Sequence, residues 1–394
     1  MNISSFLDNE VIKFSHSDCK RSIPSLFDGF KECQRKILYC LKKRKLTFDK
    51  EYVKVEQLSG YVAEHAKYHH GQETLQGTMK GMAQSFIGSN NIPILYREGA
   101  FGTRLVGGKD AGAGRYISTK LESITPFIFK EEDDVILEYL EDDGYQIEPK
   151  FYIPIIPMVL INGCTAGIGT GWSCSIPCYN PLDVIECIKV WLENDGEVLL
   201  KDPESNVNIS LLPDIKPWYR GFNGKIEKDR HRYITYGNLE KIGTNKVKIT
   251  ELPVGLWTLD FQNKCDEWVK DKRIKKPEYH NTDTKVNIVI TEEEDGFSCN
   301  INNLGLYSYL QITNMVLFNE KEQPKKYTVD QIIDDFCKVR YEYYFKRRKF
   351  IINDLEKQLK NIGNKVRFIQ EIIDDTLNIR NVEEEDVVAE LEER

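Results

Sequence analysis

The sequence contains no hydrophobic run that approaches the length of a membrane span. Its first residues, MNISSFLDNEVIKF, lack the basic start and apolar stretch of a secretory signal peptide. The ten cysteines, which lie between Cys19 and Cys337, include no CxxC pair, so neither a zinc ribbon nor a disulfide framework is indicated. We expect the cysteines to be reduced core residues of an intracellular protein.

Neither apolar nor charged residues dominate the composition. Hydrophobic residues make up 41% of the 394-residue chain and charged residues 29%, which is ordinary for a globular protein. The sequence has no internal repeat and no low-complexity segment. A chain of this length can form two or three domains, each with its own core.

The net charge of −8 argues against a protein whose whole surface binds nucleic acid. The charges are unevenly distributed, however. Residues 31–54 are distinctly basic, whereas acidic residues gather at 131–134, 292–295 and 383–393. The basic stretch fits either a groove for DNA or a solvated surface helix, and charge alone does not separate these two interpretations.

The first part of the chain shows helical patterns separated by turns. Turn residues at 24–29 precede a pattern that predicts a helix over 33–45, and a second helix is predicted over 55–66. A third helix is predicted after Gly71, with Thr74 as its cap. Three short helices with a basic surface are typical of a helix-turn-helix or winged-helix module.

The middle of the chain is predicted to be a mixed α/β region. Residues 90–114 are rich in glycine and are expected to form a loop, and a helix is predicted over 181–193. Five segments bounded by Gly, Pro and Asp are predicted strands: 151–161, 207–212, 231–236, 246–252 and 286–291.

The last section, from residue 327 onward, is predicted to be a long helix. Apolar residues recur at three- and four-residue steps from Ile332 through Phe350 to Ile362. We expect Gly363 to interrupt this helix, with a further helical stretch after it.

Tyr116 follows Arg115 directly, at the end of the segment GGKDAGAGRY. The ordinary pKa of tyrosine is about 10, so a nucleophilic tyrosine needs a neighbouring cation, a base or a metal-organised phosphate. Arg115 supplies a permanent charge that favours a phenolate and stabilises a phosphate, and the glycines let backbone approach DNA closely. The residues alone nevertheless favour an ordinary tyrosine at a strand edge, one of twenty in the chain.

Ten short motifs occur along the chain. They are RSIPSLFDGFK (21–31), QRK (34–36), YHHG (68–71), GSNN (88–91), FGTR (101–104), GGKDAGAGRYIST (107–119), YIPIIPMVLING (152–163), GIGTGWS (167–173), ELPV (251–254) and NMVLF (314–318). In this order they resemble the DNA breakage-and-rejoining region of the eukaryotic-type type IIA DNA topoisomerases. The segment 107–119 resembles the active-site segment of that family, and the resemblance covers nearly the whole chain.

The resemblance implies a role for each matching residue of the active site. Tyr116 would form a covalent 5′-phosphotyrosyl bond to DNA, and Arg115 would stabilise the transition state. Arg21 and His70 match residues that gather around the scissile phosphate, where they would stabilise developing charge. Without the resemblance, His69 and His70 would be interpreted as a surface pair, because the HxxxH spacing of a zinc helix is absent.

The resemblance also implies a DNA-binding surface. Ile168 occupies the position at which the family inserts an isoleucine between base pairs to bend the DNA; the residue alone would be interpreted as part of a core strand. Positions that match DNA contacts of the family are Lys31, Lys36, Tyr68, His69, Thr74, Trp257, Thr313 and Asn314.

Two departures from the family pattern are visible. Glu32 and Cys33 replace the Pro-Gly that usually stands in that turn. The stretch Cys164-Thr165-Ala166 is one residue longer than in relatives, which concerns the geometry of the Ile168 wedge and leaves the nucleophile unaffected.

The resemblance implies an α+β multidomain fold. We expect a winged-helix DNA-cleavage domain with the active-site tyrosine over residues 1–136 and an α/β tower domain over 137–327. Residues 328–394 would form the first part of a coiled-coil arm toward an exit gate.

Family members use Mg²⁺ held by a TOPRIM domain and ATP bound by an ATPase domain. The chain has no EGDSA-like segment with a paired-aspartate motif and no glycine-rich nucleotide site, so we expect no metal-binding or cofactor-binding residues in it. Its own aspartate pairs are interpreted as solvated turns or helix starts: 133–134, 142–143 and 334–335. The chain alone is therefore expected to cleave little or no DNA.

The favoured hypothesis is the cleavage core of an ATP-dependent type IIA topoisomerase. Its expected partners are double-stranded DNA, a second copy in a two-fold dimer, and a TOPRIM–ATPase region or subunit, without a membrane. The chain would be a fragment or a split subunit, in the nucleus or, for a large DNA virus, in the host cell. The alternatives are a non-catalytic DNA-binding subunit of the same fold and, for the region after Tyr327 only, a coiled-coil interaction module.

Overall fold

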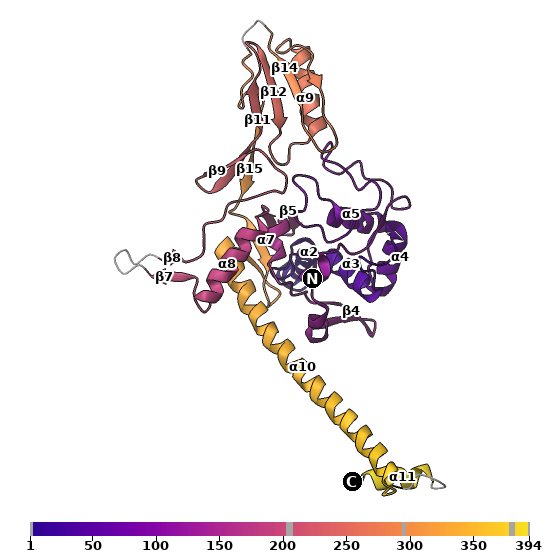
Figure 1. The fold of residues 1–394 in the computed structure, drawn as a ribbon. Helices are drawn as coiled ribbons and strands as arrows, with labels where there is room; N and C mark the ends of the chain where they lie inside the picture. Colours follow the sequence, from indigo (N-terminus) through magenta and orange to yellow (C-terminus); the bar gives the residue numbers. More distant parts are fainter. Residues whose placement is uncertain (1–2, 202–207, 294–296, 378–382, 393–394) are drawn as a thin grey trace. The chain divides into compact units, whose positions relative to one another are not determined.

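The computed structural model describes residues 3–201, 208–293, 297–377 and 383–392 (Figure 1). The chain divides into two compact units, residues 1–340 and 341–394. Its fold is mixed α and β, with a long C-terminal helix α10 (Val329–Ile373). The predicted α+β class is therefore confirmed at this level.

The first part of the chain is helical, as predicted. Its elements are α1 (Ile3–Phe6), the π-helix η1 (Leu7–Val11), α2 (Ile12–Ser22), α3 (Glu32–Lys43), α4 (Val55–His65) and α5 (Gln72–Ala83). The prediction that Thr74 caps the third helix is wrong. The helix begins at Gln72 and its N-cap residue is Gly71, so Thr74 lies inside the first turn.

Helix α3 is attached to the preceding turn by a buried ion pair. The Asp28 carboxylate accepts hydrogen bonds from Arg35 Nε at 2.7 Å and Arg35 Nη2 at 3.2 Å. It also accepts from the backbone nitrogens of Phe30 and Tyr152, both at 2.9 Å. The Asp28 carboxylate therefore joins the turn, α3 and the segment around Tyr152, which is more than a hundred residues away in sequence.

The basic stretch at 31–54 matches neither of its two interpretations completely. Arg35 and Lys36 are buried, and the Lys36 ammonium lies 2.8 Å from a carboxylate oxygen of Glu148. Lys42 is paired with Asp134. These three cations are therefore neutralised by carboxylates of the protein, because ions taken out of water need partners. The basic residues at 43–45, 50 and 54 are exposed.

The interpretation of residues 133–134 as solvated is wrong for Asp133. Asp133 is buried, and its carboxylate accepts a hydrogen bond from Arg340 Nη1 at 2.6 Å. Both aspartates lie in the 3-10 helix η2 (Glu131–Ile136), so the interpretation as a helix start is correct.

Short antiparallel strand pairs form much of the region around these helices. β1 (Val53–Lys54) pairs with β2 (Ser118–Thr119), and β3 (Tyr139–Asp142) pairs with β4 (Tyr145–Pro149). β5 (Cys164–Gly169) pairs with β6 (Trp172–Ile176) in a hairpin. The remaining short pairs are β7 (Leu199–Lys201) with β8 (Asn208–Ser210), and β16 (Met315–Phe318) with β17 (Pro324–Tyr327).

Two larger sheets follow in the middle of the chain. One has the order β15-β10-β9, with bounds Tyr307–Gln311, Arg232–Tyr236 and Lys225–Asp229. The other has the order β11-β12-β14-β13, with bounds Asn238–Lys241, Lys246–Glu251, Ile288–Thr291 and Glu278–Tyr279. Helix α9 (Thr258–Lys270) lies beside the second sheet in Figure 1. Its Phe261 and Cys265 enter a shared core with Ile249 and Ile288.

Four of the predicted middle elements are confirmed: helix α8 (Pro181–Glu193) and strands β10, β12 and β14. The predicted strand at 207–212 is present as β8, although Val207 lies outside the described residues. The predicted strand at 151–161 is wrong. Pro154 and Pro157 cannot donate ladder hydrogen bonds, and the segment instead ends in helix α7 (Met158–Asn162).

The long helix is confirmed, but its predicted interruption at Gly363 is wrong. α10 continues through Gly363 to Ile373, because one glycine costs only about 1 kcal/mol in a helix that its neighbours propagate. The further helix is present as α11 (Glu384–Glu392). A short helix α6 (Thr125–Ile128) completes the described elements.

All ten cysteines are free thiols, and eight of them are buried, as predicted. Cys33 and Cys164 are only half-buried. Among the described helices, none combines the length and the apolar character that crossing a bilayer requires.

We predict that Asp28→Ala lowers the free energy of unfolding by about 3–5 kcal/mol, because it leaves the buried Arg35 charge without its partner. Asp266→Ala, on the exposed side of α9, is the matched control and should change stability by no more than about 0.5 kcal/mol. Denaturant unfolding of both variants measures this difference. Equal stability of the two variants would contradict the structural role of Asp28.

Candidate active site

Tyr116 is held on a fixed backbone with its ring in solvent. The side chain is 69% exposed. On either side of it, the carbonyls of Gly114 and Ile117 accept hydrogen bonds from the backbone nitrogens of Glu56 at 3.2 Å and Val55 at 3.1 Å, at the start of α4. The loop therefore cannot slide along α4 without breaking these bonds, and the phenol points outward from a defined position.

Arg115 lies against Tyr116. Its guanidinium carbon is 5.0 Å from the centre of the Tyr116 ring, and its side chain is exposed. A guanidinium at this distance is attracted by the ring face and remains available for a phosphate oxygen. The pair thus presents a phenolic oxygen and a permanent positive charge together.

Trp257 supports the loop that leads to Tyr116. The indole contacts Gly107, where a Cβ atom would lie only 2.3 Å from the ring, and Gly107 has a φ of +64°. The ring also meets Phe86 edge to face, with 5.7 Å between centroids. Only glycine fits at this approach, so the half-buried Trp257 packs directly on the glycine-rich segment.

Arg21 and His70 lie together in a second cluster. Arg21 Nη1 is 3.5 Å from His70 Nε2, and the ring of His70 meets the ring of Tyr68 edge to face. Burial raises the pKa of Tyr68 to about 12, so its hydroxyl stays protonated at neutral pH. This cluster offers a guanidinium, an imidazole and a hydroxyl donor, which are suitable groups for holding a phosphate.

Asp18 connects this cluster to the β5–β6 hairpin. One carboxylate oxygen accepts a hydrogen bond from Arg21 Nη2 at 2.8 Å. The other accepts from both the backbone nitrogen and the hydroxyl of Thr170, at 2.9 Å each. Neither Asp18 nor Thr170 was predicted as a site residue, because 152 positions separate them in the sequence. The three-residue spacing of Asp18 and Arg21 on α2 is the pattern that could have indicated their ion pair.

Ile168 lies in β5 and is 76% exposed, so the interpretation as a core strand residue is wrong. Its hairpin is held on several sides. Lys31 Nζ donates to the carbonyl of Ala166 at 2.9 Å, and Asn314 Nδ2 donates to the Ser173 hydroxyl at 2.8 Å. A firmly anchored strand therefore presents a large apolar side chain to solvent.

The hairpin absorbs one extra residue in a β-bulge. Cys164 pairs with Ile176 and Gly167 with Cys174, so β5 has one more residue than β6 between these two pairs. After the bulge, Ile168 pairs with Ser173 in regular register. The bulge thus leaves the regular pairing and the exposed position of Ile168 intact.

Lys36 is placed differently from the other predicted DNA contacts. It is 4% exposed, and its ammonium donates to the carbonyl of Ala66 at 2.7 Å as well as to Glu148. Its charge is satisfied within the protein, so this geometry does not support a direct contact with DNA.

The remaining predicted contacts are at least partly accessible. Thr74 and Thr313 are exposed, and His69 is exposed with its Nε2 at 3.3 Å from an Asp142 carboxylate oxygen. Lys31 and Trp257 line one cleft of about 590 Å³, together with residues 164–166 of the hairpin. The structure therefore brings Lys31, Trp257 and the bulge to one surface recess.

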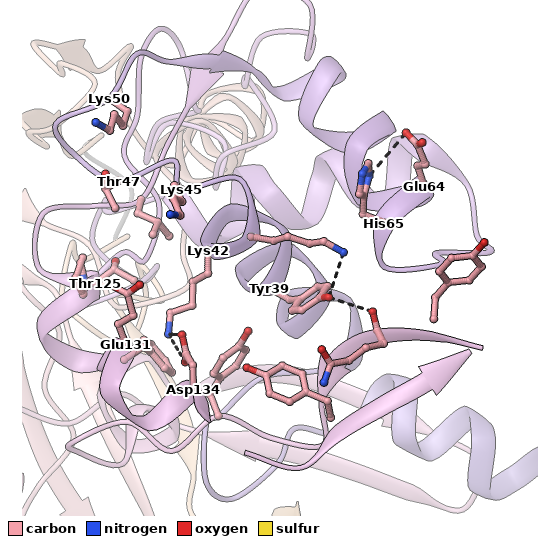
Figure 2. A pocket seen from close by; sticks show the side chains of 18 of the residues that line it. Tyr39, Lys42, Lys45, Thr47, Lys50, Glu64, His65, Thr125, Glu131 and Asp134 are labelled. Carbon is pink, nitrogen blue, oxygen red and sulfur yellow. Dashed lines mark hydrogen bonds and ion pairs between the residues drawn. The ribbon is translucent and has the colours of Figure 1, made fainter. Parts of the chain in front are cut away.

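A second cavity, of about 1030 Å³, lies beside the end of α3 (Figure 2). Figure 2 shows Lys42 bound to Asp134, and His65 directed toward Glu64. The cavity thus contains partners for Lys42 and Glu64, and none of the predicted site residues line it. Within the described ranges, no group of three or more His, Cys, Asp or Glu side chains could hold a metal ion, so the described residues do not form such a metal site beside Tyr116.

Three comparisons place these observations among known proteins. The family model for the A-type subunits of DNA gyrase and topoisomerase IV matches residues 21–394. The chain is 41% identical over 395 residues to the mitochondrial DNA topoisomerase 2 of Dictyostelium discoideum, covering 98% of the chain and 29% of that relative. It is also 41% identical over 399 residues to DNA topoisomerase 2 of Invertebrate iridescent virus 6, covering 99% of the chain and 33% of the relative.

A solved structure is similar along nearly the whole chain. It is the DNA-binding, cleavage and re-ligation domain of Plasmodium falciparum topoisomerase II, with a TM-score of 0.88 and 39% sequence identity. The similarity covers 98% of this chain and 52% of that one. The chain thus spans about a third of the length of the curated relatives it matches.

We predict that the Asp18 carboxyl has a pKa below its usual range, because Arg21 and then Thr170 donate hydrogen bonds to its charged form. Thr170→Val should raise that pKa, whereas Thr313→Val, at another exposed threonine, should not. A carboxyl with a lowered pKa keeps its contacts above the ordinary pKa and loses them as the pH falls through the folded value. A carbon-13 NMR titration of Asp18 measures this, and an unchanged pKa in Thr170→Val would contradict the contact.

Proposed function

Because this chain belongs to the family of DNA gyrase and topoisomerase IV A-type subunits, we propose that it is the DNA-binding and cleavage core of a type IIA topoisomerase. The observation that carries the proposal is the Arg115–Tyr116 pair, with its exposed phenol, adjacent guanidinium and fixed backbone. A protein that only binds DNA would not need a phenol held in this way. The proposal covers double-strand cleavage, strand passage and religation by an ATP-dependent enzyme.

In the proposed reaction, the Tyr116 oxygen attacks a phosphorus atom of the DNA backbone. The bond from phosphorus to the 3′ oxygen breaks, and a 5′-phosphotyrosyl bond forms. Religation reverses these steps without further energy input, because the phosphodiester is exchanged for another phosphate ester. Arg115 would stabilise the charge on the phosphate in both directions.

We propose that Arg21 and His70 bind the scissile phosphate together with Arg115. The contact between Arg21 and His70 supports this role, since it places two donors side by side. Asp18 would act as a positioning residue, because it holds the Arg21 guanidinium through a 2.8 Å ion pair.

The wider DNA interface would include the accessible contacts described above. Ile168 would enter the base stack, at a cost of roughly a few kcal/mol that contacts to the bent DNA offset. Tyr68 would donate its hydroxyl to the DNA backbone. The other proposed contacts are Lys31, His69, Thr74, Trp257, Thr313 and Asn314.

We further propose the three-domain division at residues 136 and 327. Helices α3 to α5 with the β1–β2 pair support a winged-helix domain. The four-stranded sheet with α9, which shares a core of its own, supports a tower domain.

An apolar stripe on α10 supports a coiled-coil arm. Exposed apolar residues recur at alternating steps of three and four from Ile352 to Ile373, and Phe345 lies one heptad before Ile352, which is the pattern of a helix that needs a partner helix. The stripe consists of Phe345, Ile352, Leu355, Leu359, Ile362, Val366, Ile369 and Ile373. Leu359 and Ile373 are each 72% exposed, so a returning helix would remove substantial apolar surface from water.

The proposed partners are double-stranded DNA, a second copy in a two-fold dimer, and a TOPRIM–ATPase region or subunit. Cleavage by both protomers would produce the double-strand break. Mg²⁺ and ATP would be held by that region, as in the family that the chain resembles. The protein would act where DNA is found, in the nucleus or, if it is viral, in the host cell.

We predict that Tyr116→Phe abolishes covalent attachment to DNA, because the variant lacks the attacking oxygen. The protein is mixed with a TOPRIM-bearing partner, labelled duplex and Mg²⁺, denatured rapidly, and assayed for labelled DNA on the protein band. Tyr145→Phe, which removes a hydroxyl of similar exposure (65% against 69%), is the matched control and should leave the adduct unchanged. If a partner competent with another cleavage subunit gives no adduct with the unaltered chain, the chain is a DNA-binding protein without catalytic activity.

We predict that Ile168→Ala reduces DNA bending, because the shorter side chain no longer separates a base step. Energy transfer between dyes at the two ends of a duplex, at saturating protein, measures the bend. Leu182→Ala, at the start of α8, removes a side chain of similar exposure (72% against 76%) and should bend DNA as the unaltered protein does. Equal energy transfer for Ile168→Ala and the unaltered protein would contradict the wedge.

A further inference from the structure

The β5–β6 hairpin contains two thiols on the same face of adjacent strands. Cys164 pairs with Ile176, and Cys174 lies two positions from Ile176 on the same strand, so its side chain points to the same side. Cys174 pairs with Gly167, so the bulge between Cys164 and Gly167 lies next to both thiols. Both are free in this structure.

The two thiols differ in accessibility. Cys164 is half-buried and lines the cleft of about 590 Å³, so a small molecule in the cleft can meet it. Cys174 is 2% exposed and lies behind it. Such an arrangement suits an accessible attacking thiol and a shielded thiol that resolves the first product.

The electrostatic surroundings activate the accessible thiol. A hydrogen bond from Cys174 lowers the pKa of Cys164, against the effect of burial, and the Lys31 ammonium adds to this lowering. The same contact and burial raise the pKa of Cys174. A lowered pKa favours the thiolate of Cys164, which is the reactive form.

We propose that Cys164 and Cys174 form a redox-sensitive modification site, at which a low-molecular-weight disulfide such as oxidised glutathione converts the pair to an intramolecular disulfide. The Cys164 thiolate attacks one glutathione sulfur and releases the other glutathione as a thiolate. The Cys174 thiol then loses its proton and attacks the Cys164 sulfur, which releases the second glutathione. The oxidant gains two electrons and the protein loses two, and the protein's two thiol protons end on the two glutathione molecules.

The disulfide would lock the hairpin that carries Ile168. It would link the two sides of the bulge and so remove the freedom of β5 to shift against β6 at this point. Ile168 lies four residues beyond Cys164 on the same strand. The chemistry of the site is independent of the proposed reaction with DNA, and only its consequence for DNA bending rests on that function.

The full chain is incubated in glutathione buffers of increasing oxidised fraction, quenched with acid, and analysed by thiol counting and peptide mass mapping. The expected result is a loss of two free thiols from ten, with a linkage between the Cys164 and Cys174 peptides that dithiothreitol reverses. Cys174→Ser should instead accumulate glutathione on Cys164. Cys33→Ser, which removes the other half-buried thiol, should behave as the unaltered protein does.

A linkage between Cys164 and Cys33, or a stable glutathione adduct on Cys164 in the unaltered chain, would overturn the proposal. Hydrogen exchange of the oxidised and reduced forms tests the lock separately from any activity on DNA. The amides of residues 165–173 should exchange more slowly in the oxidised form. Identical exchange in the two forms would contradict the conformational effect even if the disulfide forms.

Discussion

The arrangement of the site depends on the buried carboxylate of Asp28. This single group neutralises Arg35 and accepts two backbone hydrogen bonds, so it fixes the turn at 25–30 between α2 and α3. Arg21 stands before this turn and Lys31 directly after it, and Lys31 in turn holds the β5–β6 hairpin through Ala166. Removing a buried charge from its partner is costly, so the Asp28–Arg35 pair fixes the conformation of the turn. The turn in turn fixes the positions of Arg21 and Lys31 on either side of it.

The site is assembled from exposed side chains on well-anchored backbone. Tyr116 and Ile168 are among the most exposed large side chains of the first unit, yet hydrogen bonds hold the backbone of both segments to α4, α2 and the loop before β16. Exposure makes the phenol and the isoleucine available to a large polymer such as DNA. The anchored backbone keeps both side chains in position. This matters for the proposed reaction, because positioning supplies much of the rate in phosphoryl transfer.

Local patterns predicted much of the fold. Helix α8 has the predicted bounds because Asn180 caps it, with its side chain accepting from Leu182 N, and Pro181 fits the first helical position. Long-range pairing was not predictable in this way. The burial of Lys36 depends on Glu148, and the anchoring of the hairpin depends on Asp18 and Thr170; no local pattern joins residues so far apart. The motifs of the family resemblance, and not residue chemistry alone, singled out Tyr116.

The most direct test of the proposed reaction is to identify the atom that carries the DNA. The covalent adduct formed with a TOPRIM-bearing partner is digested with nuclease and protease, and the nucleotide-bearing peptide is sequenced by mass spectrometry. We expect a nucleotide joined through its 5′ phosphate to Tyr116. A nucleotide on another residue, or one joined through its 3′ phosphate, would contradict the proposed reaction.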